Sequence, residues 1–279
     1  MQTAASNSLV LTDFSSSKRF ADSQGAISYG GFYQVIASTL TRGAYRGQVF
    51  RELGDRLLAL AEHSYAFRQL DALEQISRLL VGSPLPREYQ IVGCYYQALY
   101  IQRFGRGDVV EASRSLERAA ENAKPRYRAR AMQSLGSNAF HKGDHELALS
   151  LYCEAARFAA SNSIYDAYAG LGTQKMVAVI KSEEGNHRGA LALLENLFPL
   201  AQSMRLLQPH VYYDYLNSLA VELCAVGRLE EAKNVSEIVL ASPFAPAYPE
   251  WHETRAEIEL KVRRPSRSTV GFSQSVAET

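Results

Sequence analysis

The fold of this chain is decided by the stretch AMQSLGSNAFHKGDHELALSLYCEAARFAA, residues 131–160. Apolar residues recur in it at helical spacing on both sides of the pair Gly143-Asp144. Glycine can close a helix in a left-handed conformation, and aspartate is a favoured residue at the start of the next helix. The stretch therefore predicts two amphipathic helices joined by a tight turn.

The same unit recurs along the chain, with steps of seven, five, four and three residues between its marked positions. The copies are Leu60/Phe67/Ala72/Ile76/Leu79, Tyr100/Gly107/Ala112/Leu116/Ala119, Gly136/Gly143/Ala148/Tyr152/Ala155, Ala178/Gly185/Ala190/Leu194/Leu197 and Ala220/Gly227/Ala232/Ser236/Val239. The aligned alanines are spaced by 40, 36, 42 and 42 residues. Periods of this length are typical of helical repeat proteins. The first copy is the weakest, because Phe67 stands where the others have glycine.

Each marked position has a physical role. The alanine after the turn lets the second helix pack closely against the first, and the larger residue four positions later fills the gap to the next repeat. The residue after the turn glycine is a helix N-cap type in three copies, at Asp108, Asp144 and Asn186. Glu111 stands where the carboxylate of a capping box belongs. Each unit is therefore expected to be a helical hairpin.

Residues 131–160 resemble a tetratricopeptide repeat (TPR), with the Leu-Gly, Gly-Asp, Ala, Tyr and Ala hallmarks of that family, and residues 217–243 (NSLAVELCAVGRLEEAKNVSEIVLASP) are similar. The resemblance covers roughly residues 46–262. It implies an all-α, right-handed superhelical solenoid of about five helical hairpins, whose first helices line a concave groove for peptides. The spacing of 36 to 42 residues exceeds the 34 of the family, which implies longer helices or loops and a different curvature.

The limits of the repeats are marked by proline-rich breaks and by changes in composition. The segments 83–87 (SPLPR) and 242–249 (SPFAPAYP) are expected to separate helices, and 163–166 (SIYD) to start one. Residues 249–262 are expected to form a helix that caps the stack. We expect a flexible tail over residues 1–28, the repeat domain over 29–262 and a flexible basic tail over 263–279.

The composition of the chain argues against several classes of function and location. The 279 residues are 47% hydrophobic and 21% charged, with a net charge of +1, so no strong field directs the chain to nucleic acid or anionic lipid. The cysteines Cys94, Cys153 and Cys224 are too far apart for a disulfide framework or zinc site and are expected to be reduced and mostly buried. The first residues do not resemble a signal peptide, and no stretch is long and apolar enough for a membrane span. These features predict a cytoplasmic protein without membrane contact.

Motifs for catalysis are absent from the sequence. It has no Gly-rich phosphate loop, dinucleotide fingerprint, Gly-x-Ser-x-Gly elbow or His-Glu-x-x-His helix. His141 and His145 lie four residues apart, but Gly143-Asp144 breaks the helix between them, so they need not share a face. We therefore expect no enzymatic activity, no cofactor and no metal site.

A row of polar residues on the first helices is the candidate peptide-binding site. Projection of these helices away from their packing residues gives Gln97, Arg130, Gln133, Ser137, Lys175, Asp214 and Asn217. Gln97, Gln133, Lys175 and Asn217 occupy equivalent places in successive repeats. Amides can bond to the backbone of an extended peptide, and Lys175 is expected to offer an unpaired charge to an acidic or C-terminal carboxylate. The carboxylate clamp of the family, with its paired Lys and Asn residues, is only partly present.

Tyrosines also gather on the first helices. These tyrosines are Tyr89, Tyr95, Tyr96, Tyr100, Tyr127, Tyr165, Tyr168, Tyr212, Tyr213 and Tyr215. About two-thirds of them are expected to pack between repeats, and the others are expected to face the groove.

The sequence thus favours an adaptor or scaffold that binds a protein or peptide, without naming that partner or the oligomeric state. One alternative is the ligand- or peptide-sensing arm of a regulatory system. Two basic clusters, at residues 124–130 and 261–267, could contact RNA or phosphate, although the balanced net charge argues against a dedicated nucleic-acid binder. A groove can also host an enzyme without a known motif.

Overall fold

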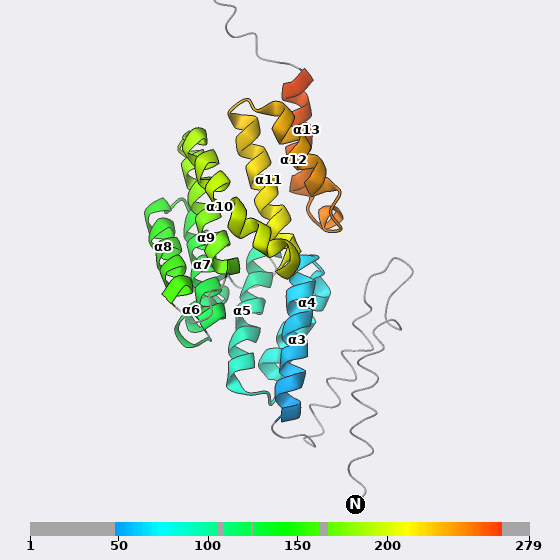
Figure 1. The fold of residues 1–279 in the computed structure, drawn as a ribbon. Helices are drawn as coiled ribbons and strands as arrows, with labels where there is room; N and C mark the ends of the chain where they lie inside the picture. Colours follow the sequence, from blue (N-terminus) through cyan, green and yellow to red (C-terminus); the bar gives the residue numbers. More distant parts are fainter. Residues whose placement is uncertain (1–47, 105–108, 124, 162–166, 264–279) are drawn as a thin grey trace, which may run out of the picture. The chain divides into compact units, whose positions relative to one another are not determined.

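The structure is a computed structural model that describes residues 48–104, 109–123, 125–161 and 167–263, and within these ranges the regular structure is entirely helical (Figure 1). The chain divides into two compact units, residues 1–127 and residues 128–279. Both predicted tails, the predicted N-cap Asp108 and the predicted helix start at residues 163–166 lie outside the described residues.

The first unit contains two helical hairpins and the first turn of a third. Its helices are α3 (Gln48–Ala66), α4 (Leu70–Gly82), α5 (Arg87–Phe104), α6 (Val109–Asn122) and the beginning of α7 (Pro125–His141). From α3 to α6, helices that are neighbours in sequence pack together, and α3 also contacts α5.

The second unit is also built of consecutive helices. It contains the rest of α7, followed by α8 (His145–Ser161), α9 (Ala167–Glu183), α10 (His187–Leu207), α11 (Pro209–Ala225), α12 (Leu229–Leu240), the short 3-10 helix η2 (Ala245–Ala247) and α13 (Pro249–Arg263). Neighbours in sequence pack together from α8 to α13, and α11 also contacts α9 and α13. The described helices are thus TPR-like hairpins, five in the described ranges, and α13 follows them, as the sequence predicts. The superhelical course of the whole chain stays a prediction.

The turn glycines take the left-handed conformation that the repeat pattern requires. Gly143, Gly185 and Gly227 have φ values of 79°, 78° and 86°. After Gly143, the Asp144 amide bonds to the Ala139 carbonyl at 3.0 Å, and so closes the first helix. The Asp144 side chain then accepts a hydrogen bond from the Leu147 amide, and Asn186 caps α10 in the same way through Gly189. These two predicted N-caps are confirmed.

The first hairpin is offset by one residue from the predicted alignment. Arg68, and not Phe67, is the left-handed residue, with a φ of 50°, and the Gln69 amide closes α3 on the Ser64 carbonyl. Counted from this turn, the packing positions fall on Leu73, Ser77 and Leu80, which are each 0% exposed; the predicted Ala72, Ile76 and Leu79 are also buried, but less completely. Phe67 follows Ala66, the last residue of α3, and its amide bonds to the His63 carbonyl at 3.0 Å, so the turn has the same form as the one at Gly143 but lies one residue later than the alignment places it.

The predicted packing positions of the other repeats are buried. Ala112, Ala148, Ala190 and Ala232 are completely buried. A small residue on the first helix accepts the large residue on the second: a Cβ atom added at Gly136 would lie 2.7 Å from the Tyr152 ring. This pairing explains the Leu-Gly hallmark of the central repeat.

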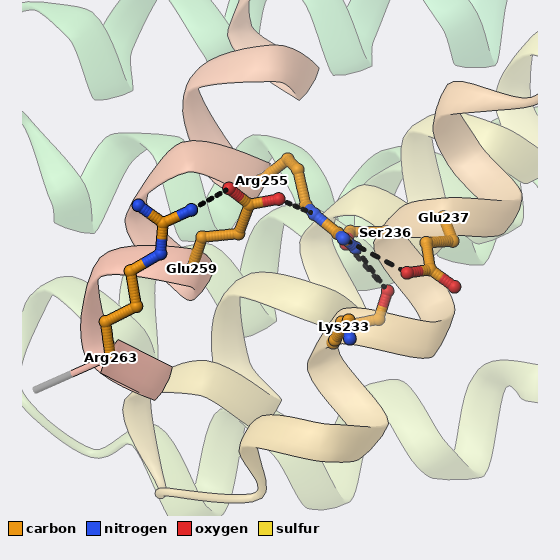
Figure 2. A network of polar contacts seen from close by, with 6 residues as sticks. All are labelled: Lys233, Ser236, Glu237, Arg255, Glu259 and Arg263. Carbon is orange, nitrogen blue, oxygen red and sulfur yellow. Dashed lines mark hydrogen bonds and ion pairs between the residues drawn. The ribbon is translucent and has the colours of Figure 1, made fainter. Parts of the chain in front are cut away.

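Both proline-rich segments separate helices as predicted, and the second leads into α13. Arg255 of α13 inserts its guanidinium between the two last helices, as Figure 2 shows. It donates to the Lys233 carbonyl and the Ser236 hydroxyl, both at 3.1 Å, and pairs with Glu237 at 3.0 Å and Glu259 at 2.7 Å. Ser236 occupies the position that Tyr152 fills in the central repeat, so the arginine of the terminal helix replaces a large side chain there.

Close contact between α4 and α5 leads to a testable prediction. A Cβ atom at Gly93 of α5 would lie 2.6 Å from the Cβ atom of Leu80. Both atoms are fixed to backbone, so Gly93→Ala must push the two helices apart, at about 1–3 kcal/mol. Better helix propensity offsets about 1 kcal/mol of this cost. We expect a net loss of up to about 2 kcal/mol in the free energy of unfolding by urea.

Gly82→Ala is the matched control, because nothing lies within 4 Å of the added atom at the end of α4. We expect it to change the stability by less than about 0.5 kcal/mol. Equal losses for both variants would contradict the close helix contact as the cause.

Candidate functional site

Most residues of the candidate site lie on the first helices of the second unit. Gln133, Lys175 and Asn217 occupy equivalent places on α7, α9 and α11 and are all half-buried. Gln97, the fourth member of this row, is half-buried on α5 of the first unit. The row is therefore neither core nor fully exposed surface.

Gln133 reaches from α7 to α9. Its amide lies against Gly172, where a Cβ atom would overlap it, so the missing side chain at position 172 makes room for the amide. Its Oε1 atom is buried and has no hydrogen-bond partner among the described residues. Ser137, one turn later on α7, donates to the Gln133 carbonyl and accepts a hydrogen bond from the Tyr152 hydroxyl at 3.1 Å.

Lys175 reaches in the same direction, from α9 to α11, and forms an ion pair with Asp214. The Lys175 side chain is 16% exposed, whereas that of Asp214 is 43% exposed. The expectation of an unpaired lysine is therefore wrong, because the carboxylate of the next repeat neutralises it. Two members of the candidate site are brought together, as partners of each other.

Arg130 is buried within the second unit, only 3% exposed, and does not lie on an open polar surface. Its guanidinium stacks 4.0 Å from the centre of the Tyr168 ring on α9. Arg128, also on α7, stacks on Phe158 of α8 at 4.5 Å. Arginine placed over an aromatic face combines a cation–π attraction with apolar packing. These two basic residues of α7 thus contribute to packing between helices.

A common geometry underlies these contacts. Gln133 meets Gly172, and Lys175 meets Asp214, so these two members of the row each contact a residue 39 positions later. That residue lies three places before the next member of the row. Asn217 ends the row on α11, half-buried, and its Oδ1 atom has no partner in the part of the chain that the structure describes.

The tyrosines serve mainly in packing, as predicted. Those buried are Tyr89, Tyr95, Tyr96, Tyr100, Tyr127, Tyr212 and Tyr215, whereas Tyr168 and Tyr213 are half-buried and Tyr165 lies outside the described residues. The Tyr215 hydroxyl donates to the Leu194 carbonyl at 2.6 Å, which ties α11 to α10. Burial raises the pKa of Tyr152 to about 12, since the charged phenolate would lose its hydration.

The described residues contain no group of three or more His, Cys, Asp or Glu side chains placed to hold a metal ion. His145 stacks on Phe140 at 5.3 Å, while His141 is exposed. Of the three free cysteines, Cys224 is buried and Cys94 half-buried, but Cys153 is exposed, in contrast to the expected burial. Within the described ranges, every helix is too short or too polar to cross a membrane.

Comparison with known proteins adds little to this description. No family model matches the sequence, and no curated protein matches it. A crystal structure of the nearly identical TPR-like repeats of a protein assigned as a kinesin light chain in Podosopora anserina is similar over 77% of this chain and 96% of its own. The sequence identity is 18% and the TM-score is 0.37.

Proposed function

We propose that this protein is a non-catalytic adaptor that binds an extended segment of another protein along the first helices of its repeats. The observation that carries this proposal is the polar row Gln133, Lys175 and Asn217, which repeats at equivalent places on the first helices of three successive hairpins, α7, α9 and α11. Stacked repeats present such residues at regular intervals, and this suits a ligand whose backbone is itself regular.

The chemistry of the row fits a peptide backbone. Amide side chains offer both donors and acceptors, and the Lys175–Asp214 pair offers one charge of each sign. Asp214 is the more exposed member of this pair. A bound segment can therefore approach the carboxylate first, and an acidic group must compete with Asp214 for Lys175.

The proposal is tested with a partner captured by the full-length chain and then purified. Lys175→Ala should weaken the binding of this partner by about 1–3 kcal/mol, because it removes a charge-assisted contact in a partly dehydrated site. Isothermal titration calorimetry measures the affinities of the wild type and the variant.

Lys142→Ala is the control, because it removes the same charge from an exposed residue in the turn between α7 and α8. Its affinity should equal that of the wild type. If Lys142→Ala weakens binding and Lys175→Ala does not, the partner uses another surface and the proposed site is wrong.

A further inference from the structure

A cavity of about 200 Å³ lies within the first unit, where the end of α4, the first turns of α5 and the end of α6 meet. The apolar part of its lining consists of Val81 on α4 with Ile91 and Cys94 on α5, which are all half-buried. Two of the three helices, α4 and α6, are the second members of their hairpins. The cavity is therefore separate from the polar row of the second unit, which lies on first helices.

Contacts within the first unit hold the lining in place. The Gln90 side chain donates hydrogen bonds to the Ser83 and Leu85 carbonyls at 3.1 and 3.2 Å, and so fixes the loop that leads into α5. A Cβ atom added at Gly93 would lie 2.9 Å from Cγ2 of Val81, which shows how closely α4 packs on α5. A cavity with a fixed lining loses little conformational entropy when a ligand enters it.

Two arginines line the cavity from different helices: Arg87 begins α5, and Arg118 lies near the end of α6. Arg118 donates through one nitrogen, Nη2, to Glu111 at 2.8 Å and to Ser115 at 3.4 Å. Among the described residues, its other two nitrogens and the Arg87 guanidinium make no hydrogen bond or ion pair. Both arginines are exposed at the edge of the cavity and keep donors for a ligand.

The size and the lining of the cavity together select its ligand. Its volume is below the roughly 300–1,000 Å³ of pockets for drug-sized ligands, so a single side chain or a short acid fits it. A guanidinium binds a carboxylate through two parallel hydrogen bonds, and Val81 and Ile91 suit a short hydrocarbon stem. A phosphate ion has no stem to cover them. Glu117 and Glu121 on the outer face of α6 weaken the field of the arginines, so direct contact must hold the ligand.

We propose that this cavity binds a carboxylate on a short apolar stem, which a glutamate side chain of another protein or a short free carboxylic acid can offer. Arg87 and Arg118 donate to the carboxylate oxygens, and the stem covers Val81 and Ile91. Glu111 competes with the ligand for Arg118. The inference goes beyond the proposed function, because none of these residues belongs to the polar row.

The Cys94 thiol reports whether the cavity is occupied, because it is part of the lining. Burial raises its pKa, so its alkylation by N-ethylmaleimide is compared at one constant alkaline pH. Mass spectrometry of the full chain after digestion follows Cys94 and, as the internal control, the exposed Cys153 of α8. The probes are butanoate, its neutral isostere butanamide, inorganic phosphate, and the peptides (Gly-Ser-Glu)4 and (Gly-Ser-Gln)4.

Butanoate should slow the alkylation of Cys94 and leave that of Cys153 unchanged. At ten times its dissociation constant only about a tenth of the cavities stay open, so the rate should fall about tenfold. Protection by the glutamate peptide but not by the glutamine peptide would identify a protein side chain as a ligand, and protection by butanoate alone would assign the cavity to free acids. Equal protection by butanamide or by phosphate would overturn the proposal, as would no protection by either carboxylate.

Four variants test the contacts. Arg87→Ala and Arg118→Ala should each weaken the protecting carboxylate about tenfold, because each removes hydrogen bonds to a charged group. Glu111→Gln should strengthen it about two- to fivefold, because it releases Arg118 from an exposed ion pair. Arg114→Ala is the matched control: it removes the same charge from an exposed position of α6 outside the cavity, and it should stay within about twofold of the wild type. An equal loss in this control would mean diffuse attraction between charges and would overturn the site.

The proposed function can fail without this site, and the reverse also holds. Lys175→Ala should leave the protection of Cys94 unchanged, whereas Arg87→Ala should leave partner binding along the polar row unchanged. Urea midpoints verify that each variant is folded. A loss of Cys94 protection in Lys175→Ala would place the carboxylate at the polar row and overturn the cavity as its site.

Discussion

Replacing Ala148 by leucine is expected to lower the free energy of unfolding by about 2–3 kcal/mol. Ala148 is completely buried in a cluster with Ala139, Tyr152 and Ile180. The Tyr152 ring already fills the space over Gly136 and cannot move toward it. The three added carbon atoms therefore have no room, and α7 and α8 must separate. Urea unfolding followed by far-UV circular dichroism measures the loss.

Glu146→Ala serves as the control for this substitution. Glu146 lies two residues earlier on the same helix and is exposed. Its replacement should leave the urea midpoint almost unchanged. Equal midpoints for the two variants would mean that the repeat alignment places the wrong residue at the helix contact.

The repeat pattern predicts most of the fold because it reflects local rules. A turn glycine, an N-cap and an alanine at fixed steps are required wherever two helices of a hairpin meet closely, so the sequence reveals them directly. These local rules do not predict the one-residue offset in the first hairpin. There Arg68 takes a left-handed conformation at a residue that the pattern does not mark. Only the hydrogen bonds of the turn reveal which residue makes it.

The candidate site is harder to predict, because it depends on contacts between repeats. The equivalent places of Gln133, Lys175 and Asn217 follow from the spacing, but the partners of their side chains do not. Lys175 extends toward Asp214 and Arg130 stacks on Tyr168, and both contacts depend on how far one hairpin is shifted against the next. The 39-residue separation of Gln133 from Gly172 and of Lys175 from Asp214 is the signal that could have indicated these contacts.

The helix that ends the repeats should depend strongly on one side chain. Arg255→Ala is expected to cost about 2–3 kcal/mol in the docking of α13, because it removes a side chain that is only 17% exposed and that bonds to two carboxylates and two neutral acceptors. The truncation also leaves a gap over Ser236, which has no large side chain of its own to fill it. Since each repeat element contacts mainly its neighbours, α13 should separate before the hairpins unfold.

The chain provides its own probe for this step. Trp251 is its single tryptophan, lies on α13 and is 1% exposed, so its fluorescence reports the docking of this helix. In Arg255→Ala the fluorescence transition in urea should precede the transition in circular dichroism, whereas in the wild type the two should lie closer together. Arg263→Ala is the control, because Arg263 is 78% exposed and, among the described residues, pairs with Glu259 at 3.8 Å.

The contact between Arg255 and Glu259 should also make the docking of α13 depend on pH. Arg255 holds the pKa of Glu259 below its usual value, chiefly through their hydrogen bond, so this pair stabilises α13 above the ordinary carboxyl pKa. The contribution is lost as the pH falls through the lowered pKa of the folded state. The fluorescence midpoint of Arg255→Ala should therefore fall less steeply below about pH 4.5 than that of the wild type. An equal dependence on pH, together with coincident transitions, would show that apolar packing around Trp251 holds α13 in place without the arginine.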